Sequence, residues 1–178
     1  MTEMYKEIRK RERSGQSLIE VMMAITMLTV GFLGIATLLS RSLALNRVTA
    51  NDVTATYLAS EGIEIAKNLI DHDVYSSGDG QWGACFTGHG TTDFELDYAT
   101  RDCSSLPAYD PSHYLLFNPA THLYGYPADM TGAPTIFTRD VKVVVNGPEI
   151  KVNSVVYWTG LDGAQGNINL EDHFWNWY

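Results

Sequence analysis

A single carboxylate stands in a long uncharged stretch near the N-terminus. Glu20 is the only charged residue between Arg13 and Arg41, and the run from Val21 to Ser40 carries no charge. Twenty helical residues span about 30 Å, the thickness of a bilayer's hydrocarbon core. The segment before Glu20 carries basic side chains at Lys6, Arg9, Lys10, Arg11 and Arg13. By the positive-inside rule, these predict a single span of the cytoplasmic (inner) membrane with the N-terminus in the cytoplasm.

An acid at this position needs a chemical partner. A carboxylate inside a bilayer costs about 2.5–3.5 kcal/mol even on the lenient insertion scale, so such groups are usually paired and functional. A cut after Gly15 would give Gln16 a cationic α-amine, four residues before Glu20. The two charges could then meet across one helical turn, or between staggered, parallel helices of two subunits. Both arrangements stay open at this stage.

Residues 14–21, Ser-Gly-Gln-Ser-Leu-Ile-Glu-Val, resemble the processing site of type IV prepilins and type II secretion pseudopilins. The resemblance implies that a dedicated prepilin peptidase cuts after Gly15 and N-methylates Gln16. It implies that Glu20, as the fifth mature residue, acts in assembly with other pilin subunits, served by an inner-membrane platform and motor. The first mature residue of the family is usually Phe or Met, so Gln16 departs from the pattern.

The resemblance favours a minor pilin or a pseudopilin over a major pilin. Many major pilins carry a proline in the membrane half of the helix, where this chain has Thr37. After assembly the filament would be extracellular or periplasmic. Adhesion, motility, DNA uptake and protein secretion are all uses of such filaments, and the sequence does not choose among them.

The membrane segment allows other interpretations. An ordinary secretory signal is disfavoured because the apolar run is too long and no small-residue cleavage site follows it. The main alternative is a monomeric, membrane-tethered binding module with an extracytoplasmic β head. An enzyme is not expected, because the sequence has no G-x-S-x-G, H-E-x-x-H or P-loop motif.

The sequence pattern predicts an α+β chain of the pilin type. We expect a leader at 1–15, a membrane or filament-core half of one helix at 16–45, an amphipathic half at 46–72, and a globular head at 73–178. Apolar residues recur at helical spacing over the amphipathic half, and the helix is expected to end near residue 70. That apolar face comprises Leu58, Gly62, Ile65, Ala66 and Leu69.

The last forty-five residues carry the clearest strand signal. Residues 135–145 are expected to form a strand with Val141, Val143 and Val145 on one face. A turn at 146–148 leads to a strand at 149–158, in which 153–154 is expected to mark a bulge. A last strand begins at 168, and part of the aromatic cluster at 174–178 should be core. Short strands are expected at 94–98, 114–117 and 122–126.

The charge balance argues against direct binding of nucleic acid. The chain has 12 basic and 21 acidic residues and a formal net charge of −9. Without the first fifteen residues, seven basic and eighteen acidic residues remain. Binding to a phosphate backbone needs clusters of Lys and Arg, and none follows the basic leader.

The cysteine pair and an acidic stretch near the C-terminus could each form a site, but no cofactor is expected at either. Cys85 and Cys103 are an even pair beyond the membrane, which favours a disulfide worth roughly 3 kcal/mol. A metal site with His89, His113 or His122 is the alternative, although no ligand spacing supports it. The stretch from residue 162 to 172 is predicted to be a solvated acidic loop. Its alternative is a calcium site with the oxygen ligands Asp162, Asn167, Glu171 and Asp172.

Overall fold

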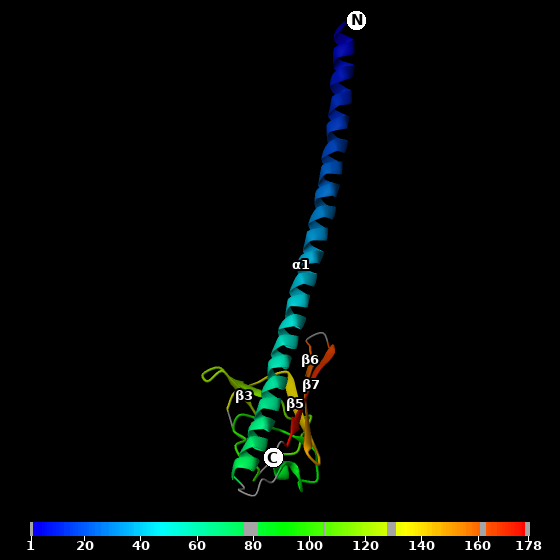
Figure 1. Cartoon of the computed structure of the whole chain (residues 1–178). Coiled ribbons are helices and arrows are strands. Elements are labelled where there is room, and N and C mark those ends of the chain that lie inside the picture. Colours follow the sequence, from blue (N-terminus) through cyan, green and yellow to red (C-terminus); the bar gives the residue numbers. More distant parts are fainter. Residues whose placement is uncertain (1, 77–81, 105, 128–130, 161–162, 177–178) are drawn as a thin grey trace. The chain divides into compact units, whose positions relative to one another are not determined.

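The computed structural model describes residues 2–76, 82–104, 106–127, 131–160 and 163–176, with side chains from Ser17 onward. The chain is α+β, as the sequence predicted. One long helix, α1 (Thr2–Ser76), is followed by strands that form two antiparallel sheets (Figure 1). The chain divides into two compact units, Met1–Arg47 and Val48–Tyr178, which are described separately.

The first unit is the N-terminal part of α1. Its large apolar side chains are exposed on every side; Leu18, Phe32 and Leu45 are exposed by 62%, 69% and 66%. The helix is long and apolar enough to cross a membrane by length and composition. Hydroxyl groups in this segment donate to backbone carbonyls three or four residues earlier, which satisfies them without water. These donors are Thr26, Thr29, Thr37 and Ser40.

The second unit packs the C-terminal part of α1 on a four-stranded sheet. The sheet order is β1-β5-β6-β7, and all neighbours are antiparallel. The apolar helix face predicted from residue 58 to 69 is buried against it, which confirms the helical periodicity. The helix runs six residues beyond the predicted end near 70. The strands are β1 (Asp93–Phe94), β5 (Phe137–Asn146), β6 (Glu149–Thr159) and β7 (Gln165–Trp175).

Gly62 sets how closely the helix approaches the sheet. A Cβ added at Gly62 would lie 2.4 Å from Ser154 Oγ and 3.1 Å from side-chain atoms of Arg139 and Val141. A larger residue would therefore push α1 away from β5 and β6. The sheet face that meets Gly62 is called the inner face below, and the opposite face the outer face.

The β5–β6 hairpin confirms the predicted turn but not the predicted bulge. Asn146 pairs with Glu149, and Gly147 adopts a φ of 60°, which favours glycine. The pairing of β6 is unbroken from Glu149 to Thr159 with β7, and no register shift occurs at 153–154. Ser154 is fully buried in an inner-face position, so strict alternation continues through it. A small polar residue stands there because α1 approaches at Gly62.

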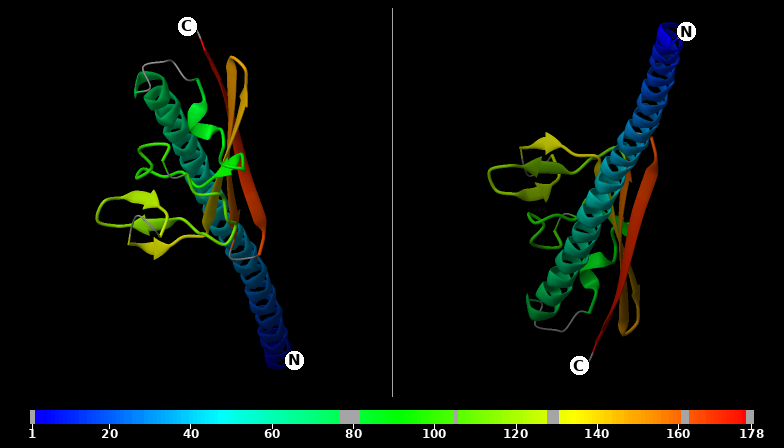
Figure 2. Two further views of the ribbon diagram at one scale, coloured as in Figure 1. Left: turned by 90° about the horizontal axis from the view of Figure 1, so that it is seen from below. Right: turned by 90° about the horizontal axis from the view of Figure 1, so that it is seen from above.

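A second, three-stranded sheet has the order β3-β2-β4, with β2 (Leu116–Asn118), β3 (Leu123–Gly125) and β4 (Ala133–Pro134). In both views of Figure 2 this sheet and β7 lie on opposite sides of α1. The predicted strand at 94–98 is wrong beyond Phe94. Residues 94–97 are all buried, and the carboxylates of Glu95 and Asp97 accept hydrogen bonds from loop backbone instead.

Candidate functional site

The predicted processing site lies within α1. The backbone is helical through Gly15, Gln16 and Glu20, while the side chain of Gln16 falls outside the described residues. Glu20 is exposed among exposed apolar neighbours such as Ile19 and Val21. The uncharged run that follows contains no cation, so this segment holds nothing of its own to neutralise the acid. Glu20 therefore places one carboxyl group at the start of an exposed, uncharged apolar surface.

Two glycines interrupt the apolar segment without a packing reason inside the chain. A Cβ added at Gly31 or Gly34 would meet nothing within 4 Å, apart from the helix's own backbone. Glycine in a helix interior costs about 1 kcal/mol relative to alanine. Small residues on membrane helices allow another helix to approach closely. Both positions are thus open to contact with a second helix.

In the head, a buried arginine joins α1 to the sheet. Arg139 lies on the inner face of β5 and is completely buried. Its Nη1 donates to Leu58 O at 2.9 Å and to Glu61 Oε2 at 3.0 Å, and its Nη2 donates to Leu96 O. The guanidinium therefore ties the helix, the sheet and the segment after β1 together. Sequence reasoning missed this residue, although the period of two through Phe137 and Val141 places it inside.

The loops beside this arginine are held by two carboxylates. Asp97 Oδ2 accepts from Tyr126 N at 2.9 Å, and the Tyr126 hydroxyl donates to Arg139 O at 2.7 Å. Glu95 Oε1 accepts from Asp110 N at 3.0 Å and lies 3.0 Å from His113 Nδ1. Burial raises the pKa of Glu95, although the Asp110 amide and His113 act in the opposite direction. A pocket of about 580 Å³ is lined by Glu95, Asp97, His113 and Tyr126, and the hydrogen bonds of these side chains hold the loops around it.

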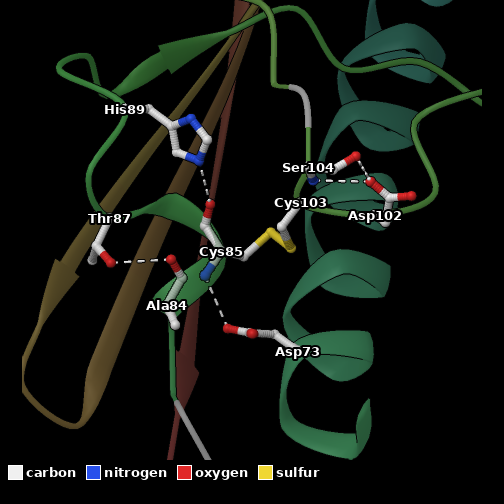
Figure 3. The surroundings of a disulfide bond; sticks show 8 residues. All are labelled: Asp73, Ala84, Cys85, Thr87, His89, Asp102, Cys103 and Ser104. Carbon is white, nitrogen blue, oxygen red and sulfur yellow. Dashed lines mark hydrogen bonds between the residues drawn. A yellow bond between two sulfur atoms is a disulfide. The ribbon is translucent and has the colours of Figure 1, made fainter. Parts of the chain in front are cut away.

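Cys85 and Cys103 form a disulfide, with the Cα atoms 5.0 Å apart (Figure 3). Cys85 belongs to the short helix η1 (Ala84–Phe86), and its amide donates to Asp73 Oδ2 of α1 at 3.0 Å. His89 Nε2 lies 3.0 Å from Cys85 O, so this histidine contacts the backbone near the bridge. The bridge thus anchors the loop region to the end of the helix, in an arrangement that is structural.

The three calcium candidates that the structure describes do not form one cluster. Asp162 lies outside the described residues, and the other three lie on β7 rather than in a loop. Alternation places Asn167 and Glu171 on the outer face and Asp172 on the inner face. Lys151, Asn153 and His173 lower the pKa of Glu171 to about 2, Lys151 most strongly. Among the described residues, no group of three or more His, Cys, Asp or Glu side chains is placed to hold a metal ion.

Asp140, on the outer face of β5, is an acid whose surroundings disfavour the ionised carboxylate. Its Oδ1 is buried and has no hydrogen-bond partner among the described residues. Burial raises the pKa of Asp140 to about 6, with a further increase from Asp93 and a decrease from Lys142. Lys142 itself pairs with Asp93 at 3.4 Å. The ionised form of Asp140 therefore opposes folding.

Asp140→Asn is expected to stabilise the head at neutral pH. Because the folded-state pKa lies above the unfolded one, the cost is fully present above about pH 6 and disappears as the pH falls below the unfolded value near 4. Asp140 is only half-buried, so screening by solvent reduces the gain to about 1 kcal/mol. Urea unfolding in detergent at about pH 7.5 and about pH 4.5 measures it.

The matched control is Asp52→Asn, an equivalent change at an exposed position of α1. The gain from Asp140→Asn should be clearly larger at about pH 7.5 than at about pH 4.5, and Asp52→Asn should show no comparable gain. Equal stability of Asp140→Asn and the unmodified chain at the higher pH would contradict the assignment.

A scan of protein-family models, a search of curated proteins and a search of solved structures each find no match to this chain. Its functional interpretation therefore rests on the residues and contacts described above.

Proposed function

We propose that this chain is a structural subunit of a type IV pilus-like filament, favoured as a minor pilin or pseudopilin. A prepilin peptidase cuts after Gly15 and methylates Gln16. The new amine then pairs with Glu20 of a neighbouring subunit as the helix leaves the membrane. Residues 16–45 contribute to the filament core, and the head is displayed outside the cytoplasm.

The exposed surface of the first unit supports this proposal. A helix that is apolar on every side needs either a bilayer or other apolar helices around it. In water, an apolar surface of this extent would be a strong liability. The membrane alone would satisfy these side chains, but it would leave the carboxylate of Glu20 unpaired at a cost of about 2.5–3.5 kcal/mol.

The position of Glu20 is the single observation that carries the proposal. An assembling neighbour that brings a cationic N-terminus removes the cost that the bilayer imposes. Docking would then be specific, because a helix in the wrong register would leave both charges unpaired in an apolar environment. In a simple membrane anchor, Glu20 would have no function, and the inserted helix would be more stable without this acid.

The head fits a structural role in this proposal. Its helix face, buried arginine and disulfide hold the second unit together, and the apolar side chains of the first unit are exposed for contact with other helices. The work of assembly comes from the platform and motor named above. The partners are the peptidase, this machinery, the membrane and other subunits; direct binding of nucleic acid is not part of the proposal.

The mass of the N-terminal peptide from the native host tests this proposal. We expect a peptide that begins at Gln16 and carries one methyl group. Gly15→Val should prevent cleavage, because a branched side chain replaces the residue before the cut. Gly31→Val, the same change further along the helix, should leave processing intact. Recovery of chains that still begin at Met1 would overturn the proposal and favour the monomeric tethered module.

A further inference from the structure

A second pocket, of about 480 Å³, opens at one end of the outer face of the large sheet. Its floor consists of side chains on the outer face of the sheet. They belong to two neighbouring sets of residues that pair across the strands. Thr138, Tyr157 and Asn167 pair across β5, β6 and β7 in the first set. Thr159 and Gln165 pair in the second set. The floor therefore offers hydroxyl groups and carboxamides around one tyrosine ring.

The wall of this pocket comes from the segment before β2. Tyr109, Pro111 and Tyr114 line it, and the Tyr109 hydroxyl lies 3.4 Å from Thr138 Oγ1 on the floor. Tyr114 and Tyr157 are exposed by 48% and 42%, so both rings are accessible to a ligand. Parts of the chain far apart in sequence thus place three tyrosines around one hollow.

On the inner face at the same end of the sheet, Trp158 is closely packed. A Cβ added at Gly166 would lie 2.3 Å from Cζ2 of Trp158, so glycine leaves the space that the indole occupies. Trp158 in turn packs on Phe137 with ring centroids 6.1 Å apart. Both Gly166 and Trp158 line the pocket, which is therefore anchored to the core.

Among the residues that the structure describes, the lining of this pocket includes no charged side chain, whereas charged side chains gather further along the outer face. Further along that face, Lys151 and His173 pair with the carboxylates of Glu171 and Glu149. The described lining consists of aromatic rings, hydroxyls, carboxamides and the apolar residues Pro111, Ile136 and Gly166. The described lining therefore offers no cation to a phosphate or carboxylate ligand and no acid to a metal ion.

We propose that this pocket binds a neutral glycan. A pyranose ring has an apolar C–H face and a rim of hydroxyl groups. Aromatic faces carry partial negative charge that suits the C–H groups. Carboxamides and hydroxyls both donate and accept, so they match sugar hydroxyls without requiring charge. Phenols are protonated at neutral pH, so the hydroxyl groups of Tyr109 and Tyr157 can donate hydrogen bonds to a sugar.

A quaternary ammonium ligand is the competing chemistry for an aromatic hollow. Asp140 lies two residues beyond Thr138 on the same face, but it does not line the pocket. The glycan assignment does not depend on filament assembly, because a head that remained tethered as a monomer would keep the same pocket. Failure of one proposal is therefore distinguishable from failure of the other.

The test is calorimetric and NMR titration of the full chain in detergent with cellohexaose, maltohexaose and chitohexaose. We expect saturable binding of at least one of these probes. Tyr157→Ala and Tyr114→Ala should each weaken it by about tenfold, the size of one lost aromatic stacking contact. Tyr75→Ala removes a tyrosine that is 91% exposed and outside the pocket, and it should leave binding unchanged.

Three results would overturn the glycan assignment. One is the absence of saturable binding of all three probes at about 10 mM. Another is binding that Tyr75→Ala weakens as much as the pocket variants do. The third is tighter binding of tetramethylammonium than of any hexasaccharide, which would assign the pocket to cations. Near-ultraviolet circular dichroism of each variant shows whether the head still folds, and Tyr114→Phe provides a milder second variant.

Discussion

Glu20→Gln is expected to lower the amount of this chain in sheared filaments by about tenfold or more. The substitution keeps the size of the side chain and removes its charge, so the neighbour's N-terminal amine loses its partner. An unpaired charge in an apolar environment costs about 2.5–3.5 kcal/mol, and each 1.4 kcal/mol is about a tenfold change in an equilibrium. Immunoblots of the sheared and membrane fractions measure the ratio between assembled and unassembled chain.

The expected defect is specific to assembly. Insertion into the membrane should persist or improve, because the substitution removes an acid from the apolar segment. Glu64→Gln is the matched control, since Glu64 is an exposed acid on the head part of the same helix. It should leave the ratio unchanged. An undiminished filament fraction for Glu20→Gln would refute the pairing of Glu20 with an amine.

The helix and the hairpin were predictable because their signals are local. Apolar residues at helical spacing from Leu58 to Leu69 identify the buried face of α1 without any tertiary information. Alternation from Val141 to Val145 and the turn around Gly147 identify β5 and its connection to β6. In these segments, local propensity and the final packing favour the same structure.

The errors arose where tertiary contacts overrode the local pattern. Ser154 suggested a bulge because it is polar, but alternation continues through it and places it on the inner face, where the close approach of Gly62 leaves room for a small side chain. Glu95 and Asp97 suggested a strand by alternation, yet their carboxylates bind the backbone of distant loops. Polar residues at 167–172 suggested a loop, but they lie on the edge strand β7, which agrees with the strand that was also predicted to begin at 168. Ser154, Glu95 and Asp97 are each in contact with a group that is distant in sequence.

Some candidate sites could likewise be predicted from local sequence, whereas others are formed only by the fold. The motif around Glu20 could be found from the sequence because a single charged residue stands out in an uncharged segment. The glycan pocket was not visible, because Tyr109 and Tyr114 reach the outer face only through the fold. Alternation could have placed Arg139 inside, but its partners on α1 required the three-dimensional packing.

Arg139→Ala is expected to lower the free energy of unfolding of the head by about 3–4 kcal/mol. Truncating this completely buried side chain leaves a cavity and removes the donor that Leu96 O uses. It also removes the ion-pair partner of Glu61, which is 31% exposed and can be partly rehydrated. Urea unfolding monitored by tryptophan fluorescence measures the loss, with Lys142→Ala as the control for an exposed cation on the same strand.

Arg139→Met separates the charge from the volume. Methionine fills much of the space without a charge to desolvate, and the replacement of buried ion pairs by apolar residues is often close to neutral. We expect Arg139→Met to lose about 1–2 kcal/mol, less than the alanine variant, because Leu96 O still lacks its donor. Equal losses for both variants would show that the hydrogen bonds outweigh packing. A loss below about 1 kcal/mol for Arg139→Ala would show that the guanidinium does not hold helix and sheet together.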